Sequence, residues 1–101
     1  MAAVQVETVV FHPNGSDVVG FDERESYGTL GDDKVLVTLP DGSLEEFIGA
    51  NGSRTSYVVT DAGTLRVNGN GEIYREYSAS GWATVEGTRA PSPRRGAGLI
   101  A

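Results

Sequence analysis

The sequence contains no cysteine, and only one histidine, one tryptophan and one methionine among its 101 residues. Without cysteine there is no disulfide, no thiolate nucleophile and no cysteine metal site, so folding must depend on side-chain burial and backbone hydrogen bonds. The first residues show no basic segment followed by an apolar one, and no apolar run reaches membrane-spanning length. We therefore expect a small protein that is made in the cytoplasm without a secretory signal and does not enter a membrane.

Residue patterns that usually support catalysis are also scarce. His12, the single histidine, lies beside Pro13 at the end of an expected strand, where a surface role is the simpler interpretation. No Gly-x-Ser-x-Gly elbow, zinc helix, phosphate-binding glycine loop or calcium loop is present. Glu45 and Glu46 are adjacent on one expected strand, so they should point to opposite faces rather than form a catalytic pair. We therefore predict that the protein is not an enzyme and holds no cofactor or metal.

Turn sequences are abundant. The four Asn-Gly steps are Asn14-Gly15, Asn51-Gly52, Asn68-Gly69 and Asn70-Gly71. Asparagine and glycine tolerate positive φ, which tight hairpin turns require in order to match the twist of their strands. Short runs rich in valine, threonine, tyrosine and isoleucine separate these turns, a spacing typical of small hairpin-built β domains.

Alternation of apolar and polar residues indicates where the strands lie. It predicts strands over residues 4–11, 17–21, 34–39, 43–48, 55–60, 64–67, 72–77 and 82–86. The expected fold is therefore all-β: an antiparallel meander of six to eight short strands in a small sandwich or partly open barrel, with an extended C-terminal arm.

Two segments do not follow the strand alternation clearly. Residues 43–50 also match a helix start, with Ser43 and Glu46 in capping-box spacing, so one helical turn is the alternative to a strand there. Residues 22–33 show neither the helical nor the strand period, are acidic and contain two glycines. We expect a long loop over that segment, of the kind that often makes contacts.

Three of the four tyrosines and the single tryptophan lie in the C-terminal half, at Tyr57, Tyr74, Tyr77 and Trp82. Tyr77 and Trp82 flank the expected turn at 78–81, so they could be cross-strand neighbours that stabilise a hairpin. The alternative is that Tyr74 and Trp82 form an exposed anchor for a protein partner, because aromatic residues dominate many binding interfaces.

Charge divides the chain into a body, residues 1–87, and a basic arm, residues 88–101. All fourteen acidic residues lie in the body against five basic ones, a net charge of −9, whereas the arm has three arginines and no acid. An acidic body repels nucleic acid and acidic lipid, so direct binding to either is not expected. The arm is rich in proline and glycine and ends in a short apolar segment. Its candidate partner-binding residues are Arg89, Arg94, Arg95, Leu99 and Ile100.

Two functions agree with this organisation. The first is a structural subunit of a larger assembly, most concretely a capsid decoration or head-tail component of a phage or virus-like particle, whose strand edges and arm contact neighbouring subunits. The alternative is a monomeric acidic regulator, such as an inhibitor or immunity protein, that blocks a basic site on a partner protein. Both predict a protein as the partner.

Overall fold

The structure is a computed structural model, and it describes residues 5–21 and 33–90. Within these ranges it contains eight strands and no helix, which confirms the predicted all-β class. The strands are β1 (Val6–His12), β2 (Gly15–Phe21), β3 (Asp33–Thr38), β4 (Leu44–Gly49), β5 (Thr55–Val59), β6 (Leu65–Gly69), β7 (Glu72–Tyr77) and β8 (Thr84–Gly87). The loop predicted before β3 lies outside the described residues except for Asp33, and so does the arm after Ala90.

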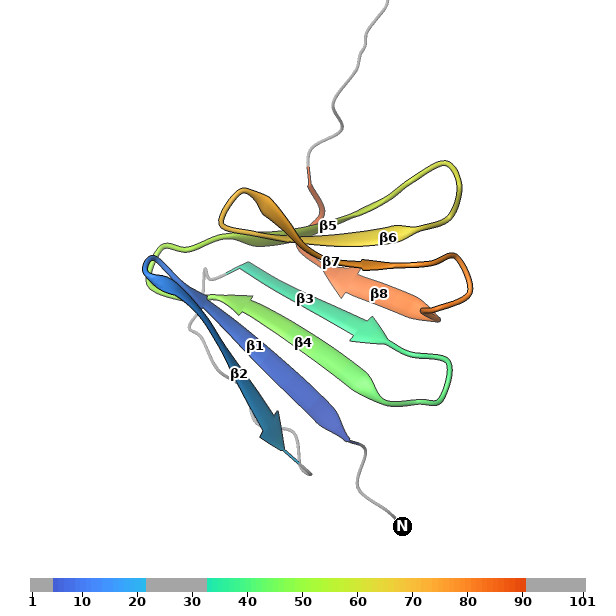
Figure 1. Cartoon of the computed structure of the whole chain (residues 1–101), viewed down its shortest axis with the longest axis horizontal. Helices are drawn as coiled ribbons and strands as arrows, with labels where there is room; N and C mark the ends of the chain where they lie inside the picture. Colours follow the sequence, from blue (N-terminus) through green and yellow to red (C-terminus); the bar gives the residue numbers. More distant parts are fainter. Residues whose placement is uncertain (1–4, 22–32, 91–101) are drawn as a thin grey trace, which may run out of the picture.

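The strands form two separate sheets rather than one closed barrel. Five strands follow the order β2-β1-β4-β3-β8, and the other three follow β5-β6-β7. Figure 1 shows the three-stranded sheet beside β3 and β8, with β2 at the opposite side of the larger sheet. The segment with two predicted outcomes, residues 43–50, contains strand β4, so the strand prediction is confirmed there.

The Asn-Gly steps mark two of the turns as predicted. Asn70 and Gly71 have φ values of 53° and 86° and join β6 to β7 between the paired residues Gly69 and Glu72. Asn51 also has positive φ, 57°, in the connection between β4 and β5. Positive φ at both central residues is the backbone geometry that a two-residue hairpin turn needs, and asparagine followed by glycine supplies it with little strain.

One pairing is parallel, whereas the expected meander has only antiparallel pairs. β1 and β4 are parallel, so the β1–β2 hairpin and the β3–β4 hairpin lie side by side in one sheet. Parallel strands are typically buried on both faces, and β1 agrees, because Val9 and Val10 point to opposite faces and both are buried. Alternation in the sequence indicates strands but not the direction in which two of them pair.

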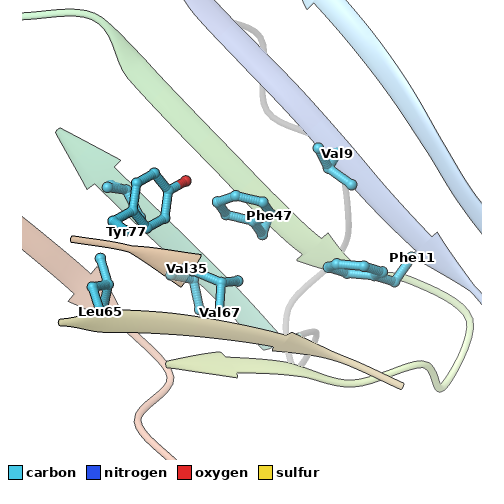
Figure 2. Packing of buried hydrophobic residues seen from close by; sticks show 8 residues of the cluster. Val9, Phe11, Val35, Phe47, Leu65, Val67 and Tyr77 are labelled. Atoms are coloured by element: carbon cyan, nitrogen blue, oxygen red, sulfur yellow. The ribbon is translucent and has the colours of Figure 1, made fainter. Parts of the chain in front are cut away.

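The core lies between the two sheets (Figure 2). Phe47 of β4 is fully buried and stacks on Phe11 of β1, with ring centroids 6.4 Å apart. The other buried members of this cluster are Val9, Val35, Val37, Leu65, Val67 and Tyr77. Because both sheets contribute to the cluster, removing apolar area from either one weakens their association.

The hairpin expected between β7 and β8 does not form. β7 belongs to the three-stranded sheet, whereas β8 pairs with β3 of the larger one. The chain turns at Ser78, whose carbonyl accepts a hydrogen bond from Gly81, and then crosses between the sheets. Tyr77 and Trp82 are therefore not cross-strand partners, and the prediction that pairs them is wrong. A short turn favours a hairpin, but here the open edge of β3 pairs with the next strand instead.

Candidate functional site

An ion-pair cluster joins the two sheets at one end of the core. Glu7 of β1 and Glu45 of β4 are directly paired in the parallel register, so their side chains lie on the same face of the sheet. Arg75 of β7 lies across from them, with Nη1 3.2 Å from Glu7 Oε1 and 3.0 Å from Glu45 Oε1. One guanidinium thus bridges two carboxylates that would otherwise repel each other, and it connects the smaller sheet to the larger one.

Tyr77 completes this cluster. Its hydroxyl donates a hydrogen bond to Glu45 Oε1, the same atom that Arg75 contacts. Burial raises the pKa of the Tyr77 hydroxyl, and the neighbouring Glu45 carboxylate raises it further. Partial burial lowers the pKa of the Arg75 guanidinium, but its hydrogen bonds to Glu45 and Glu7 outweigh that effect and hold the pKa above its ordinary value. Near neutral pH the tyrosine is therefore protonated and the arginine charged.

A local irregularity in β7 aims two of its side chains inward. Val67 pairs with Arg75 and Asn68 pairs with Ile73, which leaves Tyr74 as an extra residue in β7. The Tyr74 ring meets Phe11 edge-on, with centroids 5.0 Å apart, and the Arg75 guanidinium lies 5.4 Å from the Tyr74 centroid. Such bulges re-aim side chains, and here consecutive residues both contact the core.

The arrangement is suited to holding the sheets together. The Arg75 guanidinium also lies 5.7 Å from the Phe47 ring centroid, so the cation contacts two aromatic faces as well as two carboxylates. An open hollow of about 260 Å³ lies beside the cluster, lined by Gln5, Val6, Glu7, Ser43, Leu44 and Glu45.

Glu46 follows Glu45 in β4 but points to the other face of the sheet, where the Thr8 hydroxyl donates a hydrogen bond to Glu46 over 3.4 Å. The prediction that Glu45 and Glu46 face opposite sides is therefore confirmed.

We expect Tyr77→Phe to reduce stability at neutral pH and to lose this effect in alkali. At neutral pH the lost hydrogen bond to Glu45 should cost about 1 to 2 kcal/mol of unfolding free energy. Because the folded pKa is raised, the stabilisation is complete below the ordinary tyrosine pKa of about 10 and declines as the pH rises above it. Denaturant unfolding of both proteins at neutral pH and near about pH 11 should show the difference shrinking. A difference that stays constant would contradict the assignment.

A second polar cluster gathers three connections at another end of the fold. His12 Nε2 lies 3.6 Å from Asp17 Oδ2, and His12 Nδ1 lies 3.4 Å from Asn51 Nδ2. Asn70 Nδ2 donates to the His12 carbonyl oxygen over 3.0 Å. An open hollow lies against His12, Asp17, Asn51 and the β1–β2 turn, with a volume of about 420 Å³. Both ring nitrogens of His12 face side chains of the protein, which favours a role in joining these turns.

Tyr74 and Trp82, the predicted aromatic contact for a partner protein, are both half-buried and pack against the core. Trp82 is half-buried and its ring N–H donates to the Gly63 carbonyl, 3.0 Å away, in the β5–β6 connection. Tyr74 is half-buried against Phe11 and Phe47. Each therefore has a structural role that accounts for its position.

The start of the arm is hydrogen-bonded to both sheets. The Thr88 N–H donates to the Lys34 carbonyl over 2.7 Å, and the Tyr57 N–H donates to the Thr88 carbonyl over 3.0 Å. Arg89 forms a parallel bridge with Tyr57, and the Ala90 N–H donates to the Tyr57 carbonyl over 2.8 Å. The chain thus passes from β8 to the edge of β5. The other predicted arm residues, Arg94, Arg95, Leu99 and Ile100, lie outside the described residues.

Local sequence patterns do not reveal the Arg75 cluster. Its members come from positions near 7, 45 and 75, and only the pairing of β1 with β4 brings the two glutamates together. The single available signal was the alternation that places Arg75 and Tyr77 on one face of a strand. That pattern is common on solvent-exposed faces, so it does not by itself indicate an ion pair between sheets.

Comparison with protein-family models, with curated proteins and with solved structures finds no match for this chain. Among the described residues no group of three or more histidine, cysteine, aspartate or glutamate side chains is placed to hold a metal ion. The same part of the chain has no helix of the length and apolarity needed to cross a membrane.

Proposed function

We propose that this protein is a non-enzymatic subunit of a larger protein assembly, and that its basic arm contacts neighbouring subunits. A component of a phage or virus-like particle, such as a capsid decoration or head-tail protein, is the most concrete form of this proposal. The observation that supports it best is the path of the chain over Thr88 to Ala90, which fixes the point where the arm leaves the sandwich.

Anchoring at this point gives the arm a defined origin. Four hydrogen bonds hold residues 88–90 between β3 and β5, three of them between backbone groups and one from the Lys34 N–H to the Thr88 hydroxyl. The residues that follow therefore start from the edge of the three-stranded sheet. Eleven residues remain after Ala90. When extended they span at most about 36 to 40 Å, enough to cross the surface of an adjacent small domain.

Charge supplies the attraction in this proposal. The arm carries three arginines and no acid, and the body carries a net charge of −9. Opposite charges on an arm and on the surface of a neighbouring copy speed encounter and set orientation more than they add affinity. Apolar contacts made by Leu99 and Ile100 would then add burial at the end of the arm.

Removal of the arm after Ala90 should lower the mass of the species in solution while leaving the domain folded. Every described strand and every hydrogen bond given above lies before that point. Ending the chain at Gly87 would instead remove the contacts of Thr88 with Lys34 and Tyr57. Light scattering coupled to size exclusion, at matched concentrations of the full and truncated chains, measures the change.

The control for this truncation is a full-length chain in which Arg94 and Arg95 are both changed to Glu. It should lose the same contacts if charge drives them. Equal masses for the full chain, the truncated chain and this variant would contradict the proposal. A monomeric full chain would favour the alternative, a regulator that blocks a basic partner, and charge reversal within residues 22–33 would then be expected to weaken binding to that partner.

A further inference from the structure

The two sheets expose four strand edges, and three of them are protected against further pairing. Open edges attract other strands because their backbone donors and acceptors are unpaired, and natural proteins block them with charges, bulges, short strands or covering segments. On β5 the edge is covered at Tyr57 by Thr88 to Ala90. β7 is interrupted by the extra residue Tyr74 and has exposed Glu72 and Glu76. β8 has only four residues, of which Glu86 is exposed.

The fourth edge, β2, is the least protected, because it is long, has no bulge and is covered by no segment among the described residues. It has seven residues, pairs along its whole length with β1, and has no strand on its other side among the described residues. Asp17 is its only charged residue. Val18 is 54% exposed, one of the two most exposed large apolar side chains in the described part of the protein. Figure 1 shows β2 at the side of the larger sheet that lies away from the three-stranded sheet.

We propose that two copies of this chain associate through β2, antiparallel and about a two-fold axis, so that two five-stranded sheets become one continuous sheet. This inference rests on the proposed function, because it names one of the contacts by which the subunits assemble. A two-fold interface uses the same strand from both copies and therefore needs no second complementary surface.

The register of β2 fits such a pair. Val18 is paired with the fully buried Val9 of β1 and lies on the same face of the sheet. An antiparallel pairing centred on Val18 places the two copies of this residue opposite each other, and β-branched pairs stabilise adjacent strands. The pair formed by Val9 of β1 and Val18 of β2 would then continue into Val18 and Val9 of the second copy, across the interface between the two β2 strands.

Charge does not oppose a second copy at this edge more than at the other open edges. β2 and β8 have one acidic residue each, β7 has two, and β5, which has none, is covered at Tyr57. In the register centred on Val18, Asp17 lies opposite Val19 of the other copy and not opposite the second Asp17. The two carboxylates remain near each other on one face, so they should weaken the dimer without preventing it.

The test is the monomer–dimer equilibrium of full-length chains, measured by sedimentation over a wide concentration range. The starting protein is the full chain with Arg94 and Arg95 changed to Glu, so that contacts made by the arm are reduced. Adding Val18→Lys should raise the dissociation constant of the dimer about tenfold or more, since an edge lysine opposes strand addition. Ile73→Lys is the matched control, because Ile73 is 57% exposed on β7 and should leave the equilibrium unchanged.

Asp17→Asn tests the same register through the opposite change in the dissociation constant of the dimer. Removing the two nearby Asp17 carboxylates should tighten the dimer, and added salt should tighten the dimer of the starting protein, with Arg94 and Arg95 changed to Glu, in the same direction. A dimer that Val18→Lys leaves unaffected, an equal loss with Ile73→Lys, or a monomer at every concentration would overturn the inference. Dependence of the mass on the two arginines, in contrast, tests the proposed role of the arm, so the two proposals can fail separately.

Discussion

Gly87→Ala should destabilise the domain by about 4 kcal/mol and lower its melting temperature by about 20 °C. Gly87 ends β8 with φ of 121°, a backbone conformation that residues with a side chain rarely adopt. An added Cβ would also overlap the Lys34 carbonyl oxygen and lie 3.0 Å from the Val35 Cα. These atoms belong to the backbone of the neighbouring strand β3, so no side-chain rotation can relieve the contact.

The consequence extends beyond β8. Thr88 begins the crossing to β5 directly after Gly87, and its N–H donates to the same Lys34 carbonyl. Displacing that carbonyl therefore weakens both the β3–β8 pairing and the link between the two sheets. Calorimetry of the two proteins measures the shift in melting temperature, and amide exchange of Thr88 and Ala90 reports whether the crossing has opened.

Gly71→Ala provides the control for this substitution. Gly71 also has positive φ, 86°, but an added Cβ there meets no atom within 4 Å. Only the backbone strain remains, which should cost about 1 kcal/mol. Similar losses for the two variants would show that backbone strain alone, rather than the contact with β3, makes glycine necessary at position 87.

Most of the strand positions could be predicted because they depend on local sequence. Alternation of side chains and turn residues such as Asn70-Gly71 determine where a strand begins and ends, and these features are visible within a few residues. The pairing of strands from distant segments could not be predicted in this way. The parallel pairing of β1 with β4 and the crossing of β8 to β3 depend on which edges are free after the hairpins have formed.

The difference between local patterns and distant strand pairing also explains why the sequence does not predict the Arg75 cluster. Tyr74 and Arg75 are adjacent, so strict alternation would place one of them outside, but the extra residue in β7 turns both toward the core. Glu7 and Glu45 become neighbours only through the pairing of β1 with β4. An ion pair between sheets is therefore a property of the assembled fold, and the local sequence predicts its residues only as polar positions on strands.

The second large effect is expected from Arg75→Met, which should destabilise the domain by about 2 to 3 kcal/mol. The substitution keeps much of the apolar stem but removes the cation that separates Glu7 from Glu45, and the Glu45 side chain is only 17% exposed. Two carboxylates on one face would then be left without their shared cation. Denaturant unfolding gives the free-energy change.

Arg66→Met is the matched control, because Arg66 forms a shorter ion pair, 2.7 Å from Glu76, in which both side chains are more than 40% exposed. An exposed pair contributes about 1 kcal/mol or less, since water already stabilises both charges. If burial between sheets is what makes the Arg75 cluster important, the loss of stability should be clearly larger for Arg75→Met than for Arg66→Met, despite the shorter distance at Arg66.

Changing Glu7 and Glu45 to Gln in the Arg75→Met protein should then restore part of the lost stability, because it removes the unpaired carboxylates. Equal losses for the two arginine variants, or no recovery with the glutamines, would show that buried charge in this cluster does not hold the sheets together.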